Sequence, residues 1–247
     1  MPITDAQLDQ VVMGWNRYAE GRPESIEPND VLVKRDLNMY RGLGIENITE
    51  LALRLVEDRS VGSMEMTMGH LYERVLGSLG PRKLTNAEKG RPGFRGIDFI
   101  QDTPTEHRLV NLKAALSTSN SDITTATVSN LAAARQRWVA DFGRDDNPLR
   151  STTTTAVMIR AVARGPAKNE LTDNGILWLV GDAMWDYFGG GRDLLRRVGA
   201  ALGRNPLDFT AYTGQIEGAA SRVRRILARY ELPGEEVDWD RLLTRYP

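Results

Sequence analysis

The first part of the chain repeats its apolar residues at the spacing of an amphipathic helix. One face of the predicted helix carries Leu8, Val11, Val12 and Trp15. Thr4 or Asp5 can cap its start, because a short polar side chain can accept a bond from the first unpaired backbone amides. The same period predicts a short helix around 30–37, a helix over 46–58 and another over 64–79.

The period then changes from 3.6 to 2, which is typical of strands. Short strands are predicted over 94–100 and 108–114, with the turn-forming residues 102–106 between them. Two further segments, 153–163 and 175–180, are rich in apolar and β-branched residues and indicate buried strands. We therefore expect a hairpin that is followed by two central strands.

Helical segments complete the predicted element order. They cover 124–142, 181–188, 191–203, 210–231 and 236–245, and the Gly-, Pro- and Lys-rich stretch 80–93 is predicted to be an exposed loop. Two of the strand pairs lack an intervening helix, so the order does not fit repeated βαβ units. It predicts an α/β fold with a central mixed sheet flanked by helices, in a single domain.

Composition excludes several classes of protein. The chain has 247 residues, no cysteine and two histidines, which argues against disulfide scaffolds, zinc ribbons, thiol catalysis and multi-histidine metal sites. The formal net charge is −1, so a uniformly basic nucleic-acid-binding surface is not expected. No segment is apolar enough to span a membrane and no signal peptide is evident, so we expect a cytoplasmic protein without membrane contact.

The basic residues are strongly biased toward arginine. Of the 32 basic residues, only five are lysines, namely Lys34, Lys83, Lys89, Lys113 and Lys168. Lysine is a compact point charge, whereas arginine is a planar group that forms paired hydrogen bonds, so each lysine in this chain raises the question of why arginine is absent there.

The predicted hairpin carries an unusual group of polar residues. Asp98 stands between Ile97 and Phe99, and Asn111 and Lys113 lie in the apolar second strand. Adjacent strands can bring these side chains together at one end. A lysine in a buried strand loses hydration unless it pairs with an anion.

Two interpretations of this group remain open. In the structural one, Asp98 and Lys113 form a cross-strand ion pair, and Glu73 on the preceding helix is a solvated residue. In the functional one, Asp98 and Glu73 hold Mg²⁺ through oxygen ligands. Lys113 then orients or helps to deprotonate the attacking water and stabilises charge on a reacting phosphate.

An ordered set of short motifs resembles a known family. The set comprises Asn38-Met39-Tyr40-Arg41, Gly69-x-x-x-Glu73, Gly96-Ile97-Asp98, Leu112-Lys113, Asn120 and Trp185-Asp186-Tyr187-Phe188-Gly189. It resembles the PD-(D/E)xK nuclease superfamily, and within it the PmeII-like type II restriction endonucleases. The resemblance implies a restriction-endonuclease-like core of αβββαβ order over about 38–203, with helical appendages at 1–37 and 204–247.

The resemblance also implies a site. Mg²⁺, for which Mn²⁺ can substitute, is expected to bind Glu73, Asp98 and the backbone carbonyl of Leu112, and the catalytic set is Asp98, Lys113, Glu73 and Asn111. Asn111 departs from the family because Glu or Asp is usual there, and an amide oxygen is a weaker ligand. The segment after the lysine departs too: it reads Ala114-Ala115-Leu116-Ser117, where the family tends to have Ser-Gly-Pro-Asn.

Basic residues beside the predicted site are candidates for DNA contacts. They are Arg82, Lys83, Lys89, Arg91 and Arg95, together with Asn120. The expected partner is double-stranded DNA, because cationic side chains bind its phosphates. The alternative is a solvated basic loop.

We therefore expect a Mg²⁺-dependent DNA endonuclease, of the type II restriction class and acting in defence against foreign DNA. A homodimer is expected because a palindrome presents two equivalent half-sites, and a cognate DNA methyltransferase or another defence partner is implied. Two alternatives stay open. One is a catalytically decayed DNA-binding or scaffold protein, and the other is a non-specific nuclease effector activated by a partner or ligand.

Overall fold

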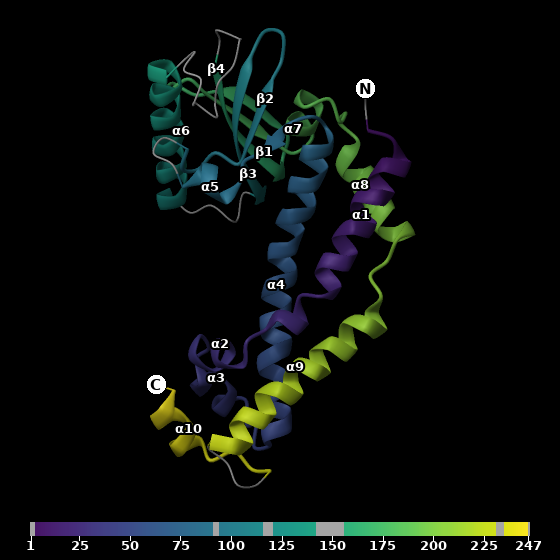
Figure 1. Cartoon of the computed structure of the whole chain (residues 1–247), viewed down its shortest axis with the longest axis vertical. Coiled ribbons are helices and arrows are strands. Elements are labelled where there is room, and N and C mark those ends of the chain that lie inside the picture. Colours follow the sequence, from purple (N-terminus) through teal and green to yellow (C-terminus); the bar gives the residue numbers. More distant parts are fainter. Residues whose placement is uncertain (1–2, 91–93, 116–120, 142–155, 231–234, 247) are drawn as a thin grey trace. The chain divides into compact units, whose positions relative to one another are not determined.

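The computed structural model describes residues 3–90, 94–115, 121–141, 156–230 and 235–246. They fall into two compact units (Figure 1). The first comprises residues 1–12 and 68–204, and the second comprises residues 13–67 and 205–247. The single domain with a core over 38–203 that the sequence suggests stays a prediction.

The first unit is built on a six-stranded mixed sheet of order β1-β2-β3-β4-β6-β5. Its strands are β1 (Arg82–Lys83), β2 (Phe99–Asp102), β3 (His107–Ala115), β4 (Ala156–Arg164), β5 (Lys168–Leu171) and β6 (Ile176–Val180). Antiparallel pairing joins β1, β2 and β3, whereas β3, β4 and β6 run parallel. The predicted α/β class with a mixed sheet is thus confirmed.

Three local predictions about the strands were wrong. The first hairpin strand begins at Phe99 rather than at residue 94, because the chain turns before it, with Gly96 at a φ of 83°. The stretch 80–93 holds β1 and the short helix α5 (Asn86–Lys89) instead of only loop. Strand β5 was missed because it is a mostly exposed edge strand with a polar sequence.

The two faces of the sheet are covered by different helices (Figure 1). Helix α6 (Ser121–Asp141) packs Leu131 and Ala134 against one face, in a buried cluster with Leu109 of β3. The other face meets helix α4, where a Cβ placed on Gly69 would lie 4.0 Å from the Ala114 Cβ. Side chains alternate along a strand, so this assignment fixes the face to which each residue of β3 belongs.

Helix α4 (Ile48–Ser78) is one continuous helix, so the two separate helices predicted over 46–58 and 64–79 were wrong. The residues between them contain Gly62 but no proline, and a single glycine weakens a helix without ending it. Residues up to Thr67 belong to the second unit, and residues from Met68 to the first.

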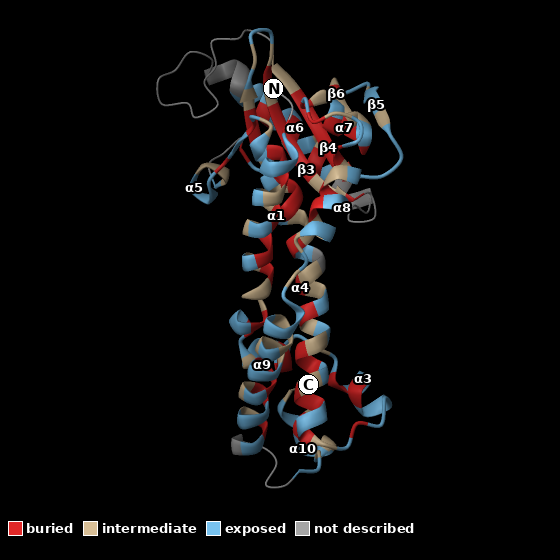
Figure 2. Cartoon of the chain, turned by 90° about the vertical axis from the view of Figure 1, so that its right-hand side faces the viewer, coloured by how far each residue is buried: buried red, intermediate tan, exposed pale blue. Residues whose placement is uncertain are grey.

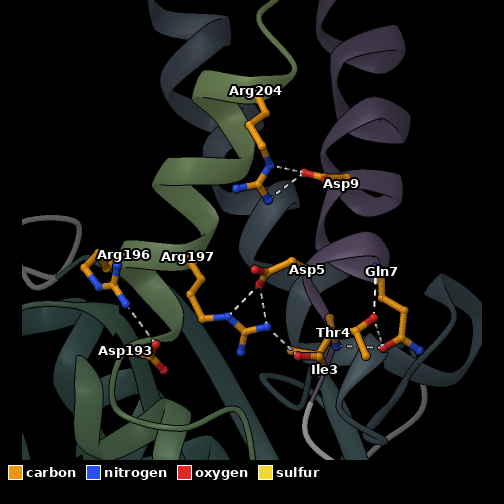
Figure 3. A network of polar contacts seen from close by, with 9 residues as sticks. All are labelled: Ile3, Thr4, Asp5, Gln7, Asp9, Asp193, Arg196, Arg197 and Arg204. Atoms are coloured by element: carbon orange, nitrogen blue, oxygen red, sulfur yellow. Dashed lines mark hydrogen bonds and ion pairs between the residues drawn. The ribbon is translucent and has the colours of Figure 1, made fainter.

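An ion-pair network ties the chain's first helical residues to the first unit (Figure 3). Helix α1 (Asp5–Glu20) supplies Asp5 and Asp9, and helix α8 (Leu194–Arg204) supplies their arginine partners. Arg197 pairs with Asp5 at 2.7 Å and Arg204 with Asp9 at 2.8 Å. These pairs are partly exposed, so each contributes little stability by itself.

A close glycine contact joins the ends of the central strands. Gly181 follows β6 and precedes helix α7 (Asp182–Tyr187), with a φ of 57°. A Cβ at this position would lie 2.3 Å from the carbonyl oxygen of Gly165, so only glycine fits. In α7, the fully buried Trp185 donates its indole N–H to the carbonyl of Ala163 at 3.0 Å.

The second unit is helical. Besides its parts of α1 and α4 it contains a 3₁₀ turn (Pro23–Ser25), α2 (Pro28–Val33), α3 (Leu37–Gly42), α9 (Phe209–Tyr230) and α10 (Trp239–Arg245). Figure 2 shows buried residues along α4 and α9, whose apolar side chains form the core of this unit. Among the helices described, none is both long and apolar enough to cross a membrane.

The motif Asn38–Arg41 lies in α3 of this second unit. Tyr40 is buried there and donates its hydroxyl to Asp58 at 2.7 Å. Burial, together with this hydrogen bond, raises the pKa of Tyr40. The motif therefore contributes packing to the helical unit through Tyr40.

Candidate active site

The pairing of β2 with β3 starts at Phe99, and Asp98 directly precedes it. The last paired residues of the ladder are Phe99 and Val110. Asp98 donates its backbone N–H to the Val110 carbonyl at 2.8 Å. Beyond this point the Asp98 side chain takes the place of a backbone acceptor, because its Oδ2 accepts a hydrogen bond from the backbone N–H of Leu112 at 2.9 Å.

The Asp98 carboxylate is held from three directions. In addition to Leu112, Lys89 Nζ lies 2.6 Å from Oδ1 and Asn111 Nδ2 lies 3.2 Å from Oδ2. The side chain is only 19% exposed. The hairpin therefore does bring Asp98 and Asn111 together, as the sequence predicts.

Asn111 leaves one strong acceptor unused. Its side-chain nitrogen donates to the Gly96 carbonyl at 2.7 Å as well as to Asp98. Its Oδ1 is buried, and across the described chain it has no hydrogen-bond partner. A buried carbonyl oxygen without a partner is costly, and such an atom is a candidate ligand for a cation or a water molecule.

The backbone carbonyl of Leu112 faces the same gap. In an extended strand the N–H and C=O of one residue point to the same side. The Leu112 N–H points to Asp98, so the Leu112 carbonyl also points to that side of β3, where β2 no longer pairs with it. Asp98 and Leu112 therefore present two oxygen donors at one sheet position.

Lys113 lies one residue further along β3. By strand alternation it shares the α6 face with Leu109 and Asn111. It is partly exposed, and its Nζ has no hydrogen-bond or ion-pair partner among the residues that the structure describes. The structural interpretation paired Asp98 with Lys113, and this was wrong: the short helix α5 brings Lys89 to that carboxylate instead.

Glu73 lies on the opposite side of the sheet. On α4 it falls between Gly69 and Gly77, one turn from each. A Cβ at Gly69 would lie 4.0 Å from Ala114 of β3, and one at Gly77 would lie 3.9 Å from Phe99 of β2. Its Oε2 accepts Lys83 Nζ at 2.5 Å, and His70 Nδ1 lies 3.0 Å away. Burial raises the pKa of Glu73, but the bonds to Lys83 and His70 outweigh burial and hold it below its usual value.

The structure thus gives each candidate acid its own lysine. Glu73 pairs with Lys83 and Asp98 with Lys89, and the two carboxylates share no hydrogen-bond partner in the described part of the chain. Within those residues, no group of three or more His, Asp or Glu side chains lies close enough to hold a metal ion. Glu73 is not a solvated helix residue, because its side chain is only 23% exposed.

The predicted DNA-contacting residues fall into three sets. Lys83 and Lys89 pair with the candidate acids, and Arg82 pairs with Glu88 at 3.0 Å. Arg95 is exposed. Arg91 and Asn120 lie outside the described residues.

Sequence reasoning missed Arg160. It is the neighbour of Asn111 on β4, and Trp178 is the next residue across the sheet. Arg160 is 4% exposed, and its guanidinium lies 4.6 Å from the Trp178 ring centre. Burial lowers the pKa of Arg160. Its position in the apolar run 156–163 was a usable signal, since arginine is rarely buried unless it is paired.

The oxygen donors at the end of the hairpin fit a hard cation. Mg²⁺ takes oxygen ligands, keeps several waters and is commonly held by one or two carboxylates plus substrate phosphates. The Asp98 carboxylate, the Leu112 carbonyl and the unpartnered Asn111 Oδ1 are such donors. The ammonium of Lys113, on the same strand, can contact an anion bound there.

Comparison of the sequence with models of known protein families, and with curated proteins, finds no match. The resemblance to PD-(D/E)xK nucleases therefore stays a prediction.

Proposed function

We propose that the chain is a Mg²⁺-dependent DNA endonuclease whose site lies where β2 and β3 separate, with Mn²⁺ able to replace Mg²⁺. One observation carries the proposal: a partly buried carboxylate, an amide oxygen without a hydrogen-bond partner among the described residues, a backbone carbonyl and a lysine lie at the same end of the hairpin. They belong to Asp98, Asn111, Leu112 and Lys113. This spacing is the one that the family resemblance implies.

The order of elements supports the same proposal. Helix α4 precedes the antiparallel strands β1, β2 and β3, then α6 crosses to β4, which lies parallel to β3. Without the four-residue α5, this is an αβββαβ sequence. A restriction-endonuclease-like core is therefore part of the proposal, with the remaining strands and helices added around it.

Each residue has a distinct task in the proposed reaction. A bound Mg²⁺ lowers the pKa of a water and neutralises phosphate charge. Asp98 and the Leu112 carbonyl would hold the cation, and Asn111 would add a neutral oxygen ligand. Lys113 orients the attacking water and stabilises the charge that develops on the phosphate. Glu73, on the other side of the sheet, is assigned to a more distant metal- or water-binding role.

The proposed substrate is double-stranded DNA, cut within the chain. We include the type II restriction activity in the proposal, with a homodimer that matches a palindromic site. Defence against foreign DNA, beside a protective methyltransferase, follows from such an activity. The exposed Arg95 is a candidate for a phosphate contact near the site.

A second candidate function is DNA binding without cleavage. The observation that favours it is the charge balance at this end of the hairpin: Asp98 already pairs with Lys89, Lys113 and the buried Arg160 add positive charge on β3 and β4, and position 111 is neutral. A single carboxylate amid three cations suits an anion better than a divalent cation. A decayed nuclease core that still binds phosphate would have this balance.

Digestion of a defined phage genome tests both candidates. The protein is incubated with the DNA in Mg²⁺, in Mn²⁺ and in EDTA, at matched salt. Discrete fragments that require metal support a restriction endonuclease, and a metal-dependent smear supports a non-specific effector nuclease. Intact DNA in all three conditions, with binding retained in a gel-shift assay, would favour the decayed core.

A further inference from the structure

The two candidate acids are neutralised by the same type of residue in a chain that otherwise avoids it. Only five of the 32 basic residues are lysine, yet Glu73 pairs with Lys83 and Asp98 with Lys89. Ion pairs elsewhere use mostly arginine, as in Arg197–Asp5. The choice of lysine at both acids therefore calls for a physical reason.

One physical reason is that a divalent cation can displace a lysine from a carboxylate more easily than it can displace an arginine. Arginine binds a carboxylate through two parallel hydrogen bonds, whereas lysine offers one mobile point charge. A lysine can neutralise a carboxylate in the absence of other ligands and still be displaced by a divalent cation that binds more strongly. An arginine in the same place would compete with the cation through a second hydrogen bond.

The fold presents Lys89 to Asp98 through a dedicated element. Helix α5 has only four residues, and a reciprocal capping box between Thr85 and Glu88 fixes its start. Arg82 of β1 clamps Glu88 at 3.0 Å. Lys89 is the last residue of this helix, and its ammonium ends 2.6 Å from Asp98 Oδ1.

We propose that Lys89 is an exchangeable counter-ion of the metal site: it neutralises Asp98 until a divalent cation binds, and its displaced ammonium then contacts a DNA phosphate. The inference rests on the proposed nuclease function and adds to it that the cation displaces Lys89 before Lys89 contacts the DNA. Metal and DNA then bind cooperatively, because the bound cation frees the Lys89 ammonium to pair with a DNA phosphate.

Calorimetric Mn²⁺ titration of the full chain tests the exchange without requiring cleavage. Lys89→Met removes the competitor, so the Mn²⁺ affinity should rise about tenfold, as expected for one opposite charge beside a carboxylate. Lys89→Arg should lower it below that of the wild type. Lys34→Met, which removes a lysine that pairs with an aspartate in the helical unit, is the matched control and should leave the affinity unchanged.

A structural role for Lys89 predicts a different pattern, in which both Lys89→Met and Lys89→Arg weaken Mn²⁺ binding. That pattern, or equal affinities in all four proteins, would overturn the exchange and leave the proposed nuclease intact. Absence of Mn²⁺ binding in every protein would instead remove the metal site and the proposed function with it. The two failures are therefore distinct.

A measurement on the unmutated protein covers the case in which a variant does not fold. Amine-selective acylation, read by mass spectrometry, should modify Lys89 faster in Mn²⁺ than in EDTA, because the displaced ammonium is more accessible. Lys34, paired with Asp30 in the helical unit, is the internal control and should react equally in both. Equal Lys89 reactivity in both conditions would contradict the exchange.

The DNA side is tested by salt dependence. Binding of a short duplex is measured at several salt concentrations with Ca²⁺, which also takes oxygen ligands, and without it. One released lysine should steepen the salt slope by about one. The steeper slope should disappear in Lys89→Met, and its persistence there would assign the extra phosphate contact to another residue.

Discussion

The two ends of the β2–β3 hairpin each carry an aspartate, but the two residues sit in different surroundings. At the turn end, Asp102 faces His107 across the strands, with 2.8 Å between carboxylate and ring. Its side chain is 54% exposed. At the open end, Asp98 is 19% exposed and accepts hydrogen bonds from three donors.

At the turn end, charged and aromatic side chains contact one another. Arg108 lies 4.3 Å from the Tyr187 ring centre, and the Tyr187 hydroxyl donates to Glu106 at 2.9 Å. Burial, helped by the bond to Glu106 and opposed by Arg108, raises the pKa of Tyr187 to about 12. At the open end, by contrast, Asn111 Oδ1 is without a partner among the residues described. The two ends therefore differ in an acceptor oxygen: the open end leaves that of Asn111 available to a ligand.

The largest expected effect separates the two ends by activity. Lys113→Ala should abolish cleavage, because losing one charge-stabilising contact to the transition state costs at least ~3 kcal/mol of barrier. Arg108→Ala, on the same strand at the turn end, should lower the melting temperature yet retain cleavage. Initial rates on plasmid DNA, with melting curves for both variants, provide the measurement. Near wild-type cleavage by Lys113→Ala would remove the active-site assignment.

The next effect compares the two aspartates directly. Asp98→Asn should lower Mn²⁺ affinity at least about tenfold, because it removes the charged ligand. Asp102→Asn, at the exposed turn end, should leave the affinity unchanged. Calorimetric titration measures the Mn²⁺ affinity of both variants. Similar losses of affinity in both would mean that the metal does not bind specifically at Asp98. The melting temperature should also fall in Asp98→Asn, since Lys89 loses its partner.

Asn111→Glu sharpens the comparison at the open end. If Asn111 Oδ1 is a ligand, a carboxylate there should tighten Mn²⁺ binding, by less than about tenfold because the neighbouring Arg160 competes for the new charge. Metal affinity and cleavage rate are measured side by side with the wild type at matched salt. Identical metal profiles would exclude position 111 from the site.

The smallest effect concerns Glu73 and acid stability. The pKa of Glu73 lies below its ordinary value of 4.5, so its ion pairs stabilise the folded state above the unfolded pKa, and this contribution is lost as pH falls through the lower folded pKa. Glu73→Gln should therefore cost less than about 1 kcal/mol at pH 7, and the cost should vanish once the pH falls below the folded-state pKa of Glu73. Melting curves from pH 7 to pH 3 measure the difference, and a constant difference throughout would contradict it.

Local patterns predicted the hairpin, the central strands and most helices. They also predicted that Asp98 and Asn111 would meet, because adjacent strands leave few alternatives. The lysine that pairs with Asp98 was not predictable in this way. Its identity depends on the path of residues 82–98, where a capping box and one arginine direct α5 back to the hairpin.

The face on which Glu73 lies was also beyond sequence reasoning. Its helix position follows from periodicity, but the side of the sheet that the helix covers depends on how the chain enters β1. Arg160 was overlooked for a different reason. Its strand was identified correctly, and the single charge within the apolar run was not treated as a signal.

The contact between Gly165 and Gly181 restricts how this protein can evolve. A side chain at position 181 would have to occupy a left-handed backbone conformation and overlap a carbonyl oxygen. No gradual series of substitutions leads away from glycine there, because even alanine is excluded. Surface arginines can drift while this glycine cannot, so distant descendants of this chain should be traceable by a glycine that directly follows the last parallel strand.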